Sequence, residues 1–148
     1  MLGAAGEYFV FEQLRVACRD FDVMNWLSKA REAFGYGPGD DSLGYDFAYD
    51  DVGGVFVGPA AVARRCLMEV KSSAQDGGSS FEMSMNEWEV ARRCHQDPSL
   101  GTYVILRVAD LMSTPRLTDV LVDPVGLHLQ GVLNYTSRDL LVVLGKAK

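Results

Sequence analysis

The chain has 148 residues, of which 48% are hydrophobic, and its formal net charge is −6. This length suffices for one domain with a hydrophobic core and is short for two, so we expect a single domain over residues 1–148, cut from a longer protein. Polar residues interrupt every apolar stretch well before the ~20 residues of a membrane helix, which excludes a membrane span. The acidic balance argues against strong non-specific binding of nucleic acid, although a local group of arginines would still permit phosphate contacts.

The cysteines and the N-terminal residues indicate an intracellular protein. Cys18, Cys66 and Cys94 are widely spaced, with no CxxC pair and no clustered histidines. We therefore expect buried free thiols in a reducing compartment and no structural zinc site. The opening MLGAAGEYFVF lacks a basic leader and runs directly into a helical pattern, which is typical of a folded domain rather than a signal peptide. The nucleus is the expected compartment if the source is eukaryotic.

The first part of the chain predicts a helix followed by strands. Over residues 3–19, apolar side chains recur at helical spacing without a proline. Residues 22–27, DVMNWL, predict a first strand, and residues 32–44 are dense in Gly, Pro and Asp and predict a loop. The segment YDFAYDDV, residues 45–52, alternates aromatic and polar side chains and predicts the second strand. Residues 53–63, GGVFVGPAAVA, would continue it as a hairpin.

The second part of the chain predicts a third strand, a helix and further strands. Residues 65–73 form the third strand, and a loop follows it. Ser84 and Glu87 have the spacing of a capping box and begin the second helix. Residues 102–109 are almost all apolar, as in a central strand that is covered on both faces. Further strands are expected at 118–123 and 138–144. This order predicts an α/β fold with a mixed central sheet flanked by helices.

The third strand contains two charges within an apolar run. Its sequence is CLMEVKSS, and because successive side chains point to opposite faces, Glu69 and Lys71 share one face. Asp46 lies on the non-aromatic face of the neighbouring strand, where cross-strand partners approach within ~5 Å. Two carboxylates this close repel each other unless a cation lies between them. A divalent ion such as Mg²⁺ prefers such oxygen ligands, and Lys71 beside it would orient or deprotonate a water or neutralise a phosphate.

Glu7 is a third acidic residue in an apolar pattern. At helical spacing it falls in the middle of the stripe formed by Phe11, Leu14 and Cys18. A buried carboxylate needs a partner, which the polar face of the sheet would provide. The alternative is that Glu7 only complements the dipole at the helix N-terminus.

The ordered set of these residues resembles a known family. The pattern Asp-x(22)-Glu-x-Lys, with a helix before and after it, looks like the PD-(D/E)xK nuclease superfamily, whose shared core is αβββαβ and restriction-endonuclease-like. In finer detail the chain resembles the C-terminal domain of the plant NO VEIN protein, a nuclease-like domain also found in prokaryotic restriction-type and helicase proteins. The segments that carry this resemblance are GAAGEYFVFEQL, NW, GYDF, MEVKSS, FEMSMNEWEVA, YVILRV and DP.

The resemblance implies a catalytic site for each position that it matches. Asp46, Glu69 and the backbone carbonyl of Val70 would bind Mg²⁺ or Mn²⁺, Lys71 would serve the attacking water, and Glu7 would support the metal site. The implied activity is hydrolysis of phosphodiester bonds in nucleic acid, with DNA favoured over RNA. Further contacts with nucleic acid are expected from the polar residues Ser72, Ser73, Arg92 and Arg93.

Two other interpretations of the same residues remain open. In the first, the domain keeps the nuclease fold but only binds nucleic acid or a partner protein, within a longer chain. In the second, Glu69 and Lys71 deter pairing at the edge of the sheet, which predicts that their strand is an edge strand. The catalytic nuclease and the binding module with a nuclease fold both predict, instead, that this strand lies inside the sheet. Glu87 is explained by the capping box and is interpreted as structural.

Overall fold

The computed structural model describes residues 2–57, 64–76, 78 and 80–135. Within them a four-stranded sheet has the order β1-β2-β3-β4. Its strands are β1 (Phe47–Asp51), β2 (Arg64–Ser72), β3 (Thr102–Ala109) and β4 (Arg116–Val122). β1 is antiparallel to β2, β2 is parallel to β3, and β3 is antiparallel to β4. The sheet is therefore mixed, as the sequence predicts.

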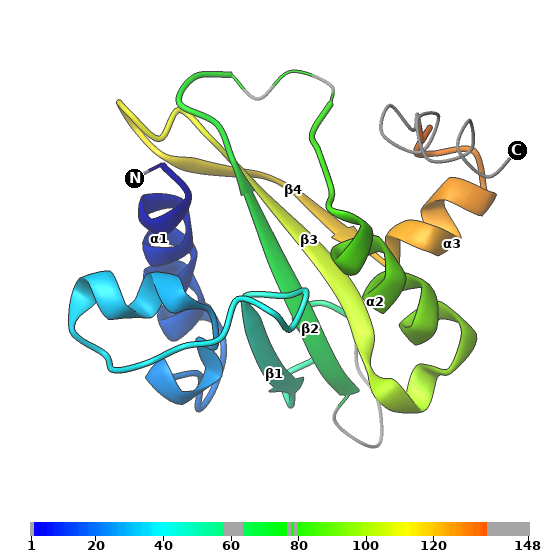
Figure 1. The fold of residues 1–148 in the computed structure, drawn as a ribbon, viewed down its shortest axis with the longest axis horizontal. Helices are drawn as coiled ribbons and strands as arrows, with labels where there is room; N and C mark the ends of the chain where they lie inside the picture. The colour runs from blue at the N-terminus through cyan, green and yellow to red at the C-terminus, as the bar shows by residue number, and fades with distance from the viewer. Residues whose placement is uncertain (1, 58–63, 77, 79, 136–148) are drawn as a thin grey trace, which may run out of the picture.

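Helices cover the two faces of this sheet (Figure 1). The helix α1 (Leu2–Ala17) lies on one side, and α2 (Met85–Gln96) lies on the other, next to the short α3 (Pro124–Leu129). Three 3-10 segments complete the described part of the chain, at Val23–Asn25, Lys29–Phe34 and Pro98–Leu100. This arrangement confirms the α/β class with a mixed sheet flanked by helices.

The alternation along β2 divides the core into two parts. Cys66, Met68 and Val70 pack on the side of α1, whose buried stripe includes Phe11 and Leu14. On the other side, a second apolar cluster joins α2 to the sheet through Ala91, Cys94, Leu67, Tyr103 and Ile105. The apolar positions at helical spacing in α1 and α2 thus face opposite sides of one strand. Glu69 and Lys71 belong to the side that α2 covers.

The position of β2 decides one of the open interpretations. β2 pairs with β1 on one edge and with β3 on the other, so it lies inside the sheet. The interpretation of Glu69 and Lys71 as a device at the sheet edge is therefore wrong. Charges on an interior strand need another explanation, since no edge is left for them to protect.

The predicted strand at residues 22–27 is absent. The carboxylate of Asp22 accepts a hydrogen bond from the Val23 N–H, and Asn25 accepts one from the Asp22 N–H, which bends the chain into the 3-10 turn Val23–Asn25. Trp26 then forms only an isolated bridge with Phe47. The apolar residues of DVMNWL thus fill the core from a turn, so two strands, rather than three, precede α2 in the described residues.

Other boundaries differ in detail. The loop predicted at 32–44 begins inside the 3-10 segment Lys29–Phe34. Residues 53–57 form turns and no strand, while the rest of the predicted hairpin, 58–63, lies outside the described residues, as does the predicted strand 138–144. The helix at 3–19 and the strands at 45–52, 65–73, 102–109 and 118–123 are all present, with ends shifted by a few residues.

Gly6 allows α1 to approach β2 closely. A Cβ atom at this position would overlap the hydroxyl of Ser72. That hydroxyl is buried and has no hydrogen-bond partner within the described structure. Because Glu7 follows Gly6, the close approach also determines where the Glu7 carboxylate lies.

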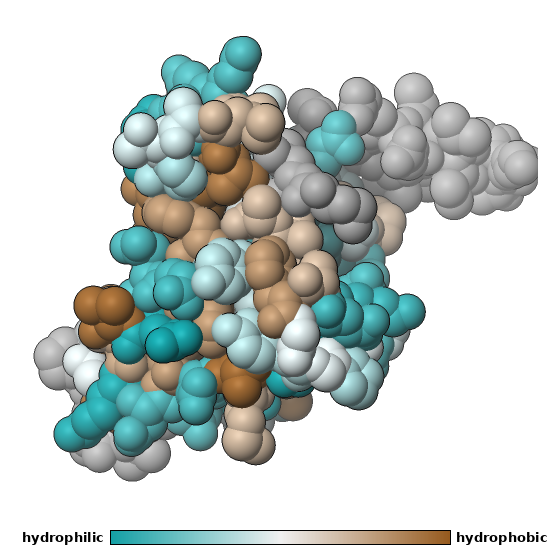
Figure 2. Space-filling model, turned by 90° about the vertical axis from the view of Figure 1, so that its left-hand side faces the viewer, coloured by the Kyte–Doolittle hydropathy of each residue, from teal (hydrophilic) through white to brown (hydrophobic). Residues whose placement is uncertain are grey.

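The surface on the side of α1 is mixed in character. Figure 2 shows apolar residues there in small separate groups among polar ones. Exposed apolar side chains of this part of the chain include Val16, Met24 and Phe34. The coloured part of this view therefore shows no broad apolar surface. None of the described helices has the length and apolar character needed to cross a membrane.

Candidate active site

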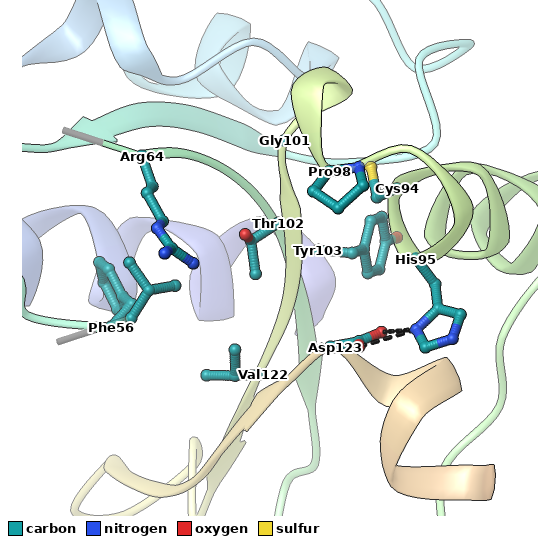
Figure 3. Close-up of a pocket in the computed structure, with 11 residues that line it drawn as sticks. Phe56, Arg64, Cys94, His95, Pro98, Gly101, Thr102, Tyr103, Val122 and Asp123 are labelled. Atoms are coloured by element: carbon teal, nitrogen blue, oxygen red, sulfur yellow. Dashed lines mark hydrogen bonds and ion pairs between the residues drawn. The ribbon is translucent and has the colours of Figure 1, made fainter. Parts of the chain in front are cut away.

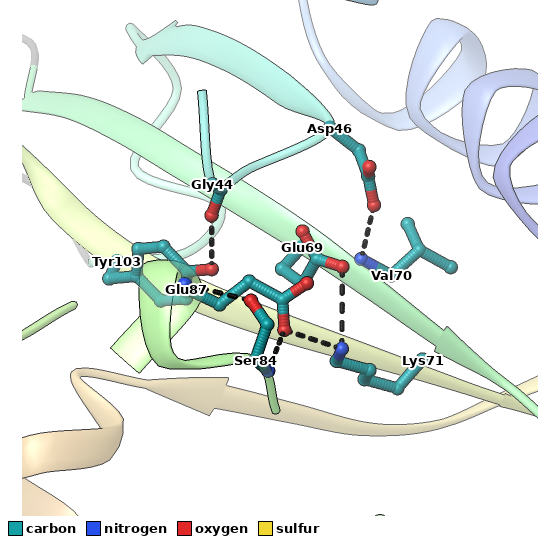
Figure 4. A network of polar contacts seen from close by, with 8 residues as sticks. All are labelled: Gly44, Asp46, Glu69, Val70, Lys71, Ser84, Glu87 and Tyr103. Carbon is teal, nitrogen blue, oxygen red and sulfur yellow. Dashed lines mark hydrogen bonds and ion pairs between the residues drawn. The ribbon is translucent and has the colours of Figure 1, made fainter. Parts of the chain in front are cut away.

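Asp46 lies at the point where β1 begins. Its backbone N–H donates to the carbonyl oxygen of Met68 at 2.7 Å. Its side-chain Oδ2 accepts a hydrogen bond from the backbone N–H of Val70 at 2.9 Å (Figure 4). The N–H and C=O of one strand residue point to the same side. The Val70 carbonyl therefore leaves β2 on the edge where Asp46 lies, as a shared ligand role would require.

Glu69 is buried beside Asp46, with only 7% of its surface exposed. Burial raises the pKa of Glu69 to about 10, and the negative charges of Asp46 and Glu87 add to this increase. Burial also raises the pKa of Asp46 well above its usual range, followed by the charge of Glu7, while the Val70 N–H acts in the opposite direction. Both carboxyl groups thus resist ionisation unless a cation compensates them.

Lys71 provides one such cation. Its Nζ lies 2.7 Å from Oε1 of Glu87 and 3.5 Å from Oε2 of Glu69 (Figure 4). Burial works against the charged form, but the carboxylates of Glu69 and Glu87 outweigh it and raise the pKa of Lys71. In this arrangement the lysine is protonated. It is suited to neutralise a phosphate or orient a water, and it is poorly suited to accept a proton.

Glu87 is a site residue that the sequence interpretation missed. It forms the predicted capping box, because it accepts from the Ser84 N–H at 3.0 Å and donates its own N–H to Ser84 Oγ at 3.1 Å. The same Oε1 atom also accepts from Lys71. A topological signal was available, since a helix that connects two parallel strands begins near the end of the first strand. That end of β2 carries Lys71.

Glu7 reaches this region from α1. Its Oε1 accepts a hydrogen bond from Trp26 Nε1 at 3.0 Å and another from the Ser28 hydroxyl. Burial raises the pKa of Glu7, although these two hydrogen bonds oppose the increase. No acidic residue lies in the first turn of α1, so the interpretation of Glu7 as a partner of the helix dipole is not supported. Glu7 instead joins α1 to the segment before β1 and adds its charge near Asp46.

Tyr103 supports the site from β3. Its hydroxyl donates to the Gly44 carbonyl oxygen at 2.6 Å (Figure 4). Burial, followed by the charge of Glu69, raises the pKa of Tyr103, so it remains a neutral hydrogen-bond donor. Because Gly44 lies two residues before Asp46, this contact holds the segment that positions the aspartate. The residue types in the sequence contain no signal for this long-range contact.

The acidic composition of the site fits a hard divalent cation. The charges of Glu7 and Glu87 act on Asp46, and those of Asp46 and Glu87 act on Glu69, while the cation Lys71 acts on both in the opposite direction. No set of three His, Cys, Asp or Glu side chains among the described residues is arranged to hold a metal alone. Mg²⁺ usually needs only one or two carboxylates, with water and substrate phosphate as further ligands. Asp46, Glu69 and the Val70 carbonyl would suffice on that basis.

The four expected nucleic-acid contacts lie in different settings. The Ser72 hydroxyl is buried against Gly6, whereas Ser73 Oγ donates to the Gln75 carbonyl oxygen at 2.6 Å. Arg92 and Arg93 both bind the carboxylate of one half-buried residue, Glu89, on α2. The structure therefore brings together Asp46, Glu69, Val70 and Lys71, with Glu7 close by, and leaves these serines and arginines outside that cluster.

Together these observations define an α/β protein with a buried acidic site between its two helical layers. The chain belongs to the family described as Protein NO VEIN, C-terminal, whose family model matches residues 6–120. This match confirms the resemblance to the NO VEIN C-terminal domain that the sequence predicts. No curated protein and no solved structure matches the chain.

Proposed function

We propose that this domain is a metal-dependent nuclease that hydrolyses phosphodiester bonds of nucleic acid, with DNA favoured over RNA. The observation that carries this proposal is the burial of Glu69, on the interior strand β2, beside Asp46, which directly precedes β1. Buried carboxylates that repel each other destabilise a fold. A functional ligand is the simplest reason for a protein to keep them together.

Each residue of the site has a separate role in the proposed hydrolysis. Asp46, Glu69 and the Val70 carbonyl would hold Mg²⁺ or Mn²⁺. When bound, such an ion activates a water and stabilises the charge that develops on a phosphate. Lys71 supplies a fixed positive charge beside the phosphate, and Glu87 orients its ammonium group. Glu7 contributes negative charge near Asp46, and its carboxylate accepts a hydrogen bond from Trp26.

Metal titration combined with plasmid nicking tests this proposal. We expect Mg²⁺ or Mn²⁺ to bind the wild-type domain in a calorimetric titration and to support nicking of supercoiled DNA. Asp46→Asn and Glu69→Gln should lose both properties. Asp50→Asn is the matched control, because Asp50 lies in β1, directly after the segment that holds Asp46, but is exposed and pairs with Arg65 at 3.7 Å. Wild-type protein that binds no metal, or a control that fails as completely as the site variants, would overturn the proposal.

A binding module without catalysis is the second candidate. The observation that favours it is that Arg92 and Arg93 share the single carboxylate of Glu89 outside the acidic cluster, so this part of α2 keeps a net positive charge for phosphate contacts that do not involve the acidic site. The Asp46 carboxylate also has a backbone partner in Val70. Metal binding by the wild type without nicking of DNA or RNA, together with retained binding of nucleic acid or of a partner protein, would favour this second function.

A further inference from the structure

A cavity with both polar and apolar lining lies at the opposite end of β2 from Lys71. Its volume is about 390 Å³, and its lining includes Arg64 at the start of β2 and Thr102 at the start of β3. Figure 3 shows the side chains of Arg64 and Thr102 pointing into the same hollow, with Asp123 and His95 on the other side of it. This volume is within the range of small-molecule sites.

Arg64 provides a cation in this cavity that no described residue neutralises. Its cross-strand neighbour is Asp51, but that carboxylate accepts the N–H groups of Val55, Phe56 and Val57 at 2.8, 2.9 and 3.1 Å. By contrast, the adjacent Arg65 forms an ion pair with Asp50. A guanidinium beside a hydroxyl is suited to bind an oxyanion such as phosphate.

The walls of the cavity are held in place by their own contacts. Asp51 holds the turn that supplies Phe56 to one wall. On the other wall, Asp123 Oδ2 lies 2.9 Å from His95 Nδ1, and Asp123 Oδ1 accepts from the Gly126 N–H at 3.1 Å. Each Asp123 oxygen thus has one of these partners and keeps capacity to accept another hydrogen bond, so this end suits a ligand that itself donates hydrogen bonds. Phe56, beside Arg64, and Val122 provide apolar surface in the same cavity (Figure 3).

We propose that this cavity binds a small organic phosphate monoester of about mononucleotide size. The phosphate lies at Arg64 and Thr102, the apolar body lies against Phe56 and Val122, and donor groups face Asp123. This inference does not depend on the proposed nuclease activity. Tyr103 lines this cavity and also supports the segment before Asp46, but the residues assigned here to the ligand, Arg64, Thr102 and Asp123, lie outside the cluster around Glu69 and Lys71.

Calorimetric titration with AMP and with adenosine tests the proposal, in the presence of EDTA so that metal binding cannot contribute. We expect AMP to bind the wild-type protein and adenosine, which lacks the phosphate, to bind at least about tenfold more weakly. Arg64→Ala should weaken AMP binding by a similar factor, and Thr102→Val by less. Arg65→Ala, the matched control, should bind AMP as the wild type does.

Three outcomes would overturn this proposal. The first is that the wild type does not bind AMP, and the second is that it binds AMP and adenosine with equal affinity. The third outcome is an equal loss of AMP affinity in Arg64→Ala and Arg65→Ala. Nicking assays on Arg64→Ala separate the two proposals, because the metal-binding residues are untouched in this variant. Lost AMP binding with retained nicking is the expected result. Failure of nicking in the wild type would count against the nuclease proposal alone.

Discussion

The ammonium group of Lys71 lies 2.7 Å from Oε1 of Glu87, the same atom that accepts the N–H of Ser84 at the start of α2. One carboxylate oxygen thus joins the interior strand of the sheet to the N-terminus of the helix that covers it. The lysine cannot shift away from this helix end without losing its closest partner. Glu87 therefore has two separable roles, one in capping the helix and one in orienting Lys71.

Substitutions at Glu87 and Ser84 should separate these roles. Ser84→Ala removes the cap acceptor and should cost about 1 kcal/mol of stability, while nicking by the metal-loaded domain stays near the wild-type rate. Glu87→Ala removes the partner of Lys71 as well, and we expect nicking to fall on the order of 10–100-fold. Thermal unfolding and initial nicking rates measured on both variants check this. Equal loss of activity in the two variants would assign Glu87 to capping alone.

The metal-free domain should become less stable as the pH rises, through Glu69. Its pKa in the folded protein is about 10, above its ordinary value of 4.5. The folded state therefore keeps a proton that the unfolded state releases. The stabilisation from this proton is fully present below about 4.5 and is lost as the pH rises towards about 10. Glu69→Gln removes this dependence, so the variant should gain stability over the wild type with rising pH.

Urea denaturation in EDTA at about pH 6 and about pH 8 measures this effect. We expect the wild type to lose up to about 1 kcal/mol per pH unit more than Glu69→Gln. Glu12→Gln on the exposed side of α1 is the control and should follow the wild type. Parallel stability curves for the wild type and Glu69→Gln would show that the carboxyl group is already ionised at neutral pH.

Replacing Gly6 should disturb both the fold and the site. Gly6→Ala creates an overlap with the Ser72 hydroxyl, and we expect a loss of about 1–3 kcal/mol in stability. Gly3→Ala on the same helix has open space around it and should be neutral or stabilising by up to about 1 kcal/mol. Adding Ser72→Ala should restore part of the loss, because it removes the overlapping oxygen. Chemical denaturation of the four proteins tests this, and an unchanged Gly6→Ala variant would contradict it.

The cysteines should be unreactive in the native protein. Burial raises the pKa of Cys18 to about 11 and that of Cys66 to about 12, so almost no thiolate exists at neutral pH. We expect iodoacetamide to label them only as the protein unfolds in urea. Mass spectrometry of samples taken across the unfolding transition measures this labelling. Rapid labelling without denaturant would show that the core around α1 opens locally.

Local patterns in the sequence predicted most of the elements. The apolar stripe of α1, the alternation along β2 and the capping box of Ser84 and Glu87 each depend on residues close together in the chain. Their periodicities follow directly from the geometry of helices and strands. The same periodicities brought the site candidates forward, because Glu69 and Lys71 interrupt an apolar run and Asp46 lies on the face of the neighbouring strand that would meet them. Residues 22–27 misled this reasoning, because a side-chain contact between Asp22 and Asn25 bends a strand-like segment into a turn.

Contacts between distant residues were decided only by the tertiary structure. The register between β1 and β2 places the Asp46 carboxylate against the Val70 N–H, and the crossover through α2 brings Glu87 to Lys71. The same packing buries Ser72 under Gly6 and leaves Arg64 without a partner among the described residues while Arg65 is paired. The sequence by itself determined which faces of the helices and strands are apolar and which polar residues lie on those faces, because helix and strand periods are local properties. Which of these polar residues meet depends on how the strands and helices pack, and no local pattern contains that information.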